Sequence, residues 1–226
     1  MYAKRLEKLY SVFSLFETRT EVYQKDIVKL IGISQPSVVR ELQQLEKDKR
    51  IKARHEDSKG KGPGCDVWSL TFQGLFFMLK HVNNLADVEA IANTYPDKLL
   101  IFKKWHLFKQ AEIDLGILEV LKMVVRNFDT GYLNPDLKYL KPLKDQKVQV
   151  LEIDWNNEKE IAEAIDRAIL LKMISLHIAE SQILMSICKH DPELNLFLDK
   201  CLKIEIAEKE SEFKTLGAIK EEWVKV

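Results

Sequence analysis

One short segment of the sequence combines glutamine, arginine, serine and lysine side chains: Ser34, Gln35, Ser37, Arg40, Lys52, Arg54, Lys59 and Lys61. A glutamine amide can form two hydrogen bonds with adenine, and an arginine guanidinium can form two with guanine. A serine hydroxyl can bond to a base or a phosphate, and lysine pairs with phosphate. These residue types predict contacts with the base edges and the backbone of a nucleic acid.

Two predicted helices precede this segment. The first covers residues 3–17, where apolar side chains repeat at helical spacing. The second covers about residues 24–31, and the apolar spacing predicts that Ile27, Leu30 and Ile31 face inward. Gly32 follows, and glycine suits the left-handed conformation that often ends a helix. The chain is therefore expected to turn sharply before the next element.

A third predicted helix carries the first four polar side chains. It covers residues 35–47, with Ser34 as its expected N-cap and Pro36 in its first turn, where a missing N–H has no cost. One apolar stripe repeats at helical spacing and predicts the buried face: Val38, Leu42 and Leu45. The serines, Gln35 and Arg40 then lie at the start or on the outer face.

A predicted hairpin carries the other four basic side chains. Residues 51–55 alternate apolar and polar side chains, which predicts a half-buried strand with Lys52 and Arg54 on its exposed face. Residues 56–64 form a glycine-rich loop, and residues 65–70 form the returning strand. An apolar helix capped by Thr71 is expected next.

Two stretches, "DIVKLIGISQPSVVRELQQLEKDKRIKAR" and "CDVWSLTFQGLFFML", resemble the DNA-binding domain of the MarR- and PadR-like winged-helix regulators of bacteria and archaea. The resemblance covers about residues 3–80. It implies that helix 35–47 enters the major groove of duplex DNA and that the wing, residues 56–64, contacts the flanking backbone or minor groove.

The chain departs from this pattern at two positions. Many relatives have a small polar residue where this chain has Val39, which could touch a thymine methyl group or be packed by a partner. Relatives often have glycine after the recognition helix, where this chain has Lys49. A lysine in a left-handed cap is strained by roughly 1 kcal/mol, so the helix is expected to end differently.

The composition is that of an ordinary globular protein, with 226 residues, 46% hydrophobic and 31% charged. Basic and acidic side chains balance at 35 each, but they are unevenly distributed. Residues 1–80 have 15 basic and 10 acidic side chains, a net of +5, and residues 81–226 have the other 20 and 25, a net of −5. A basic N-terminal part favours a nucleic-acid partner.

We expect a cytoplasmic protein without membrane contact. An odd number of cysteines fits a reducing compartment: Cys65, Cys188 and Cys201. The N-terminus lacks the continuous apolar core of a signal peptide. The most apolar run, residues 168–179, is broken by Lys172 and His177 and is shorter than the roughly 20 residues of a spanning helix.

The rest of the chain is expected to be helical, with one short strand near residues 147–155. Helices are predicted near residues 85–94, 97–110, 113–127 and 156–190, and from Pro192 towards 224. One apolar stripe is wide enough to need cover on most sides: Ile161, Ile165, Ala168, Ile169, Met173, Leu176, Ile183 and Ile187. Its cover is either the rest of the chain or a second subunit.

Other patterns give little support for nucleotide binding, metal binding or catalysis. "SKGKGPGC" lacks the ending of a phosphate-binding loop and lies between strands. A metal site at Cys188, His190 and Cys201 lacks an evident fourth ligand. His106 could line an effector pocket, although a partly buried helix face is the simpler interpretation. We expect no enzymatic activity, no cofactor and no metal.

These observations predict a mainly α protein. Residues 1–82 form a winged helix-turn-helix domain with a two-stranded wing, and residues 83–226 form an all-helical domain. The expected function is sequence-specific regulation of transcription by a homodimer that binds double-stranded DNA, with a small-molecule effector left open. The alternative is a non-enzymatic winged helix that binds proteins within a larger assembly.

Overall fold

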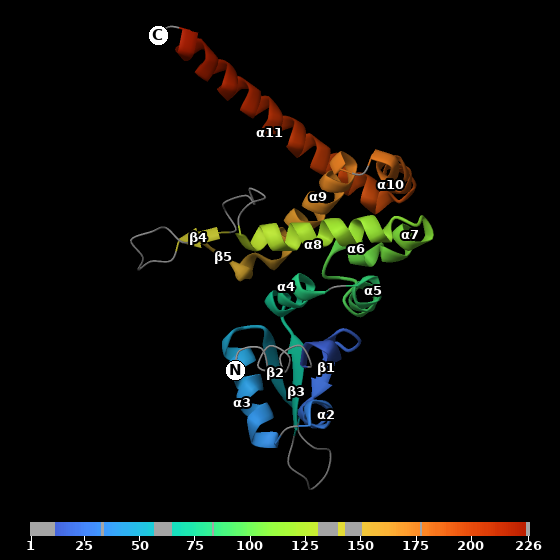
Figure 1. The fold of residues 1–226 in the computed structure, drawn as a ribbon, viewed down its shortest axis with the longest axis vertical. Coiled ribbons are helices and arrows are strands. Elements are labelled where there is room, and N and C mark those ends of the chain that lie inside the picture. Colours follow the sequence, from blue (N-terminus) through green and yellow to red (C-terminus); the bar gives the residue numbers. More distant parts are fainter. Residues whose placement is uncertain are drawn as a thin grey trace.

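The computed structural model describes residues 12–32, 34–56, 65–82, 84–130, 140–142, 151–176 and 178–224. They form mainly helices, as predicted, with a small three-stranded antiparallel sheet and a separate pair of short strands. The molecule is elongated (Figure 1): the sheet, α2 and α3 lie at one end, stacked helices form the middle, and α11 projects from the other end.

The predicted elements that follow residue 23 are present at their predicted positions. They are α2 (Gln24–Ile31), α3 (Gln35–Lys47), β2 (Ile51–Glu56), β3 (Cys65–Leu70) and α4 (Phe72–His81). Of the predicted helix 3–17, residues 12–16 are helical and residues 3–11 lie outside the described residues. Gly32 adopts the expected left-handed conformation, with φ 64°. Thr71 caps α4 by accepting a hydrogen bond from the Gly74 N–H at 3.0 Å. Local signals for turns and caps were therefore sufficient to place these elements.

A third strand was not predicted. Residues Glu21–Tyr23 form β1, which pairs antiparallel with β3 so that Val22 lies opposite Trp68; the strand order is β1-β3-β2. Three residues are too few for an alternating pattern to be recognised. The strand makes β3 the centre of the sheet, and β2 with β3 forms the hairpin.

The inward-facing residues of α2 were only partly predicted. Ile27 is fully buried, as expected, but Leu30 is 50% exposed, so its predicted burial was wrong. Val28 is half-buried, which centres the packed side of the helix between Ile27 and Val28. Leu30 lies well away from that direction at 100° per residue.

The end of α3 overturns the prediction made from Lys49. The Lys49 N–H donates to the Glu46 carbonyl, and the Arg50 N–H donates to the Leu45 carbonyl, both at 2.9 Å. These are the two bonds of a Schellman motif, with Lys49 in the left-handed position at φ 56°. The helix ends as it would with glycine, and the lysine bears the strain.

Replacing Lys49 with glycine is therefore expected to stabilise the protein by about 0.5–1 kcal/mol, because glycine adopts a positive φ without steric cost. The matched control is Lys47→Gly, inside the last turn of α3, which should destabilise by about 1 kcal/mol. Urea unfolding measures both. Equal losses of stability in the two variants would show that Lys49 bears no backbone strain.

The C-terminal half contains two short strands as well as helices, so the prediction of an all-helical domain was wrong. Its elements are α5 (Leu85–Thr94), α6 (Leu100–Lys103), α7 (Trp105–Gln110), α8 (Asp114–Thr130), β4 (Leu140–Pro142), β5 (Leu151–Ile153), the 3-10 helix η2 (Trp155–Asn157), α9 (Glu158–Leu176), α10 (Ile178–His190) and α11 (Pro192–Val224). β5 falls within the strand suspected at residues 147–155, and it pairs with β4.

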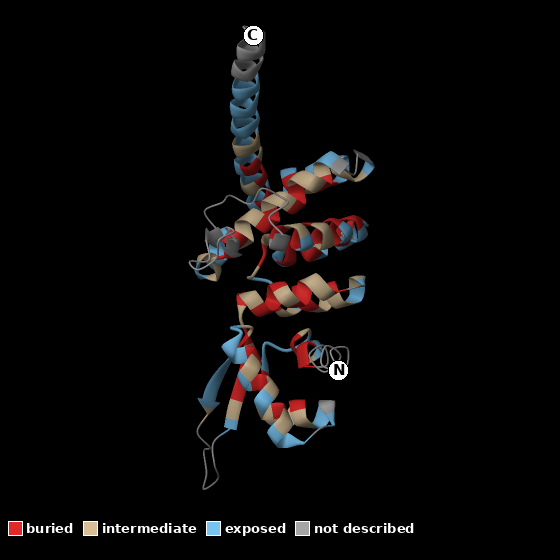
Figure 2. Ribbon diagram, turned by 60° about the vertical axis from the view of Figure 1, so that its left-hand side comes forward, coloured by how far each residue is buried: buried red, intermediate tan, exposed pale blue. Residues whose placement is uncertain are grey.

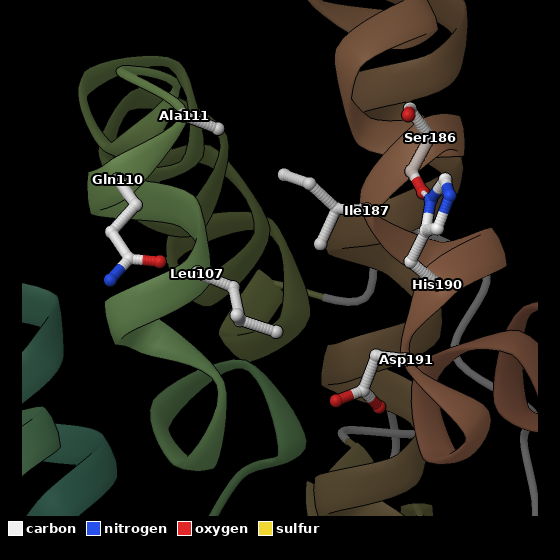
Figure 3. A pocket seen from close by; sticks show the side chains of 7 residues that line it. All are labelled: Leu107, Gln110, Ala111, Ser186, Ile187, His190 and Asp191. Carbon is white, nitrogen blue, oxygen red and sulfur yellow. Dashed lines mark hydrogen bonds between the residues drawn. The ribbon is translucent and has the colours of Figure 1, made fainter.

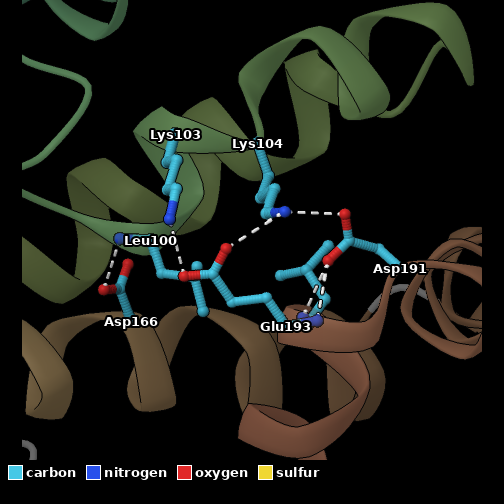
Figure 4. A network of polar contacts seen from close by, with 7 residues as sticks. Leu100, Lys103, Lys104, Asp166, Asp191 and Glu193 are labelled. Carbon is cyan, nitrogen blue, oxygen red and sulfur yellow. Dashed lines mark hydrogen bonds and ion pairs between the residues drawn. The ribbon is translucent and has the colours of Figure 1, made fainter.

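Two predicted helices are each divided in two. Residues 97–110 contain α6 and α7, and residues 156–190 contain α9 and α10. The first of these also begins later than predicted, at Leu100, where Asp166 of α9 accepts a hydrogen bond from the Leu100 N–H at 2.8 Å (Figure 4). Asp166 accepts a second hydrogen bond from the Ile101 N–H at 3.1 Å. A cap supplied by a distant helix fixes where α6 begins.

A second polar contact fixes the start of α11 (Figure 4). Lys104 lies 2.7 Å from a carboxylate oxygen of Asp191 and 3.1 Å from one of Glu193. Asp191 also caps α11 by accepting from the N–H groups of Glu193 and Leu194, as its position before Pro192 predicted. The direction of α11 is therefore tied to the α6–α7 segment.

One hydrophobic core runs through the molecule without a break (Figure 2). It joins Phe16 and Leu42 of the N-terminal part to Phe128 of α8 and to Met173 and Leu184 of the C-terminal helices. The division into domains at residue 82 stays a prediction. Among the described helices, none combines the length and apolar character needed to cross a membrane.

Candidate nucleic-acid interface

The start of α3 presents polar side chains to solvent, as predicted. Ser34, Gln35 and Arg40 are exposed, and Ser37 is half-buried. The opposite side of the helix contains the predicted buried stripe: Val38, Leu42 and Leu45. Burial of that stripe against the sheet turns the polar face outward.

Ser34 occupies the N-cap position, but its side chain has a different partner from the one expected. Its Oγ lies 3.0 Å from the Oγ of Ser37, so the two predicted contact residues are hydrogen bonded to each other. The backbone carbonyl of Ser34 accepts from the Ser37 and Val38 N–H groups. Val39, one of the departures from the family pattern, is half-buried beside this face.

The basic residues of the hairpin differ in their availability. Lys52 is exposed, whereas the Arg54 guanidinium lies 3.1 Å from Glu21 of β1 and 2.8 Å from Glu56. The negative charge of Glu21, with a smaller effect of Glu56, raises the pKa of Arg54. Arg54 keeps its charge, but its guanidinium already forms ion pairs with two carboxylates. Lys59 and Lys61 lie outside the described residues.

A cleft of about 410 Å³ lies between the start of α2, the start of α3 and the far end of the hairpin. Gln35 lines it together with Lys25 from α2 and with His55 and Asp66 from the two paired strands. Sequence reasoning did not single out Lys25. Its spacing of four from Lys29, which places both cations on one side of α2, was the available signal.

Contacts at the base of the hairpin hold it against α4. The Thr71 N–H donates to the Arg50 carbonyl at 3.0 Å, and the Thr71 hydroxyl donates to the Lys49 carbonyl at 2.6 Å. The Arg50 guanidinium lies 3.7 Å from the ring centroid of Phe77 on α4. Gly74 lies directly against the Arg50 backbone. The hairpin and α3 are thus fixed to the helical body at this junction.

A second cavity, of about 380 Å³, lies between α7 and α10 (Figure 3). Leu107 and Ile187 point into it from opposite sides, and Asp191 lies at one end. His106, considered for an effector pocket, is exposed and does not line this cavity. The walls offer apolar contact, while the Asp191 carboxylate is already bonded to Lys104 and to the start of α11.

The residues considered for metal binding have other surroundings. Burial raises the pKa of the Cys188 thiol, and also that of the Cys201 thiol, to about 11, so both are protonated at neutral pH. The Nδ1 of His190 lies 2.7 Å from the carbonyl oxygen of Ser186. Within the part of the chain that the structure describes, no three His, Cys, Asp or Glu side chains are grouped to hold a metal ion.

Comparisons with protein-family models, with curated proteins and with solved structures give no match for this chain. Its function is therefore argued from its own geometry and chemistry.

Proposed function

We propose that residues 1–82 form a winged helix-turn-helix that binds double-stranded DNA, and that the protein is a sequence-specific regulator of transcription. The observation that carries the proposal is the arrangement at one end of the molecule (Figure 1). There the polar start of α3 follows α2 and Gly32, and it shares a cleft with the far end of a two-stranded hairpin.

In this proposal α3 enters the major groove with its N-terminal end against the bases. Gln35 and Arg40 are the expected readers of base edges, since both are exposed and their side chains can form paired hydrogen bonds. Ser34, Ser37 and Lys52 bond to phosphates or bases nearby. The wing, residues 56–64, with Lys59 and Lys61, contacts the flanking backbone or minor groove, and Arg54 contributes less because it is paired.

A homodimer completes the proposal, because two copies of α3 could then meet successive major grooves. The projecting part of α11 supports it: Ile206 is 57% exposed, Phe213 72% and Leu216 60% (Figure 2). These side chains lie on one stripe of the helix. Sedimentation should then find about twice 26.3 kDa, and a single 26.3 kDa species at micromolar concentration would contradict the dimer.

The second candidate function is a protein-interaction module. Two observations favour it: carboxylates pair with Arg54 and His55 on the hairpin, which lowers the positive charge there, and α11 exposes an apolar stripe. This candidate predicts no salt-dependent affinity for DNA.

Fluorescence anisotropy of a labelled duplex, titrated at several salt concentrations, decides between the two. A plot of log affinity against log salt concentration is expected to fall with a slope of about −0.9 for each phosphate contacted. Lys59→Ala/Lys61→Ala removes two such contacts and should flatten this slope by about 1.8. On a duplex selected for tight binding, Arg40→Ala should weaken binding by about tenfold or more.

The matched control is Lys203→Ala, which removes an exposed cation from α11, far from the sheet. It should leave both affinity and slope unchanged. If the native protein does not bind duplex DNA near 50 mM salt, the DNA-binding proposal is wrong, and the protein-interaction function becomes the better supported one.

A further inference from the structure

The cleft beside Gln35 is lined by a lysine side chain, Lys25, which the proposed contacts of α3 and the hairpin do not involve. Lys25 is exposed at the start of α2, and its Nζ lies 5.2 Å from the ring centroid of Tyr23. This contact between ammonium and aromatic ring holds the side chain near the cleft. Among the described residues, none forms an ion pair with Lys25, so its charge is available to a ligand.

The neighbouring charged groups differ from Lys25 in this respect. Arg54 is paired with Glu21 and Glu56, and the three side chains together carry one positive and two negative charges. His55 Nδ1 lies 2.9 Å from a carboxylate oxygen of Asp66, which is the one acidic side chain that lines the cleft. Among the described residues that line the cleft, the cation available to an anion is therefore Lys25, and the opposing charge is Asp66.

We propose that this cleft binds one backbone phosphate of duplex DNA, with the Lys25 ammonium as its cation and the amide NH₂ of Gln35 as a further hydrogen-bond donor. The inference rests on the proposed function and adds a site to it. A phosphate held here is adjacent to the start of α3, because Gln35 lines the cleft and is also the first residue of that helix. The contact fixes the depth and register of α3 in the groove without reading a base.

The test repeats the salt titration of duplex binding with Lys25→Ala, Lys25→Arg and Asp66→Asn. Loss of one phosphate contact should flatten the slope by about 0.9, which corresponds to an affinity about eightfold lower near 0.1 M salt. Lys25→Arg should retain the native slope, since it keeps the charge. Asp66→Asn should bind more tightly than the native protein, because it removes the carboxylate that repels phosphate.

The controls separate this inference from the proposed function. Lys203→Ala on α11 should match the native protein, and thermal melts should show that every variant is folded. If the native protein fails to bind duplex DNA, both proposals fall. If it binds and Lys25→Ala retains the native slope, only the phosphate site is wrong.

Calorimetry with inorganic phosphate distinguishes a DNA phosphate from a free one. Negligible heat at millimolar concentrations supports the backbone phosphate, which is held in place by the rest of the duplex. Binding of inorganic phosphate that disappears in Lys25→Ala, combined with a native duplex slope in that variant, would assign the cleft to a free phosphorylated molecule and overturn the inference.

Discussion

Replacing Gly74 with alanine is expected to destabilise the protein by about 3 kcal/mol or more, the largest effect that we predict for a single methyl group. A Cβ atom at this position would overlap the carbonyl oxygen of Arg50 and lie 2.9 Å from its carbonyl carbon and from a methyl carbon of Leu70. The obstacle is backbone, which cannot rotate away as the end of a side chain can.

The strain would fall on the junction that holds the hairpin. The Arg50 carbonyl accepts from the Thr71 N–H at 3.0 Å, and at 2.9 Å it shares the Thr71 hydroxyl proton with the Lys49 carbonyl. Moving α4 away from this carbonyl would weaken these bonds and the cap that Thr71 provides to α4. We therefore expect the N-terminal part to lose both stability and its fixed orientation.

The matched control is Gly116→Ala in α8. The three atoms nearest to a Cβ there all belong to the carboxylate end of Glu180, a flexible side chain, and alanine is about 1 kcal/mol better than glycine within a helix. Urea unfolding should find a loss for Gly74→Ala and little change or a gain for Gly116→Ala. Similar stability of the two variants would mean that α4 does not approach Arg50 as closely as described.

The second large effect concerns Asp166, the only polar or charged residue among the described ones that is fully enclosed. Burial raises the pKa of its carboxyl group from 3.8 to about 7, against the opposing effect of the two N–H donors from Leu100 and Ile101. In the unfolded chain the same group titrates near its ordinary value.

The sign of the pH effect follows from this difference. The folded state holds the Asp166 proton more tightly, so the group contributes its full stabilisation below about pH 4 and loses it as the pH rises to about 7. A shift of this size corresponds to a change of up to about 4 kcal/mol. Native protein should therefore lose stability relative to Asp166→Asn over this range, because asparagine does not titrate.

The measurement is the free energy of unfolding in urea at pH 4.5, 6 and 7.5 for both proteins. Asp199→Asn removes a carboxylate from the exposed part of α11, with 56% of that side chain accessible, and should follow the native pH profile. Parallel profiles for native protein and Asp166→Asn would mean that the two N–H donors outweigh burial and that the carboxyl group is ionised throughout.

The sequence was sufficient for elements whose ends are marked locally. Gly32 ends α2, Ser34 and Pro36 mark the start of α3, and Asp191 with Pro192 marks the start of α11. Each signal lies within a few residues of the boundary that it sets. The buried face of α3 was equally accessible, because its apolar spacing is regular.

The remaining features depend on residues that are distant in sequence. The start of α6 is capped by Asp166, 66 residues after Leu100, and Arg54 is paired with Glu21, 33 residues before it. No local pattern shows such partners. The cost of a left-handed lysine at position 49 was recognised from the sequence. The structure nevertheless has the Schellman ending, with Lys49 in the left-handed conformation, and the sequence pattern alone did not predict this.

The projecting end of α11 gives the molecule the mechanics of a lever. α11 has 33 residues, which at 1.5 Å per residue amounts to about 50 Å. Its first part is held against the helical body, because Leu194, Leu198 and Cys201 are buried and Arg167 of α9 pairs with Glu208. The arm from Glu208 to Val224 is about 24 Å long, so a rotation of about 5° where it leaves the body carries its far end through about 2 Å.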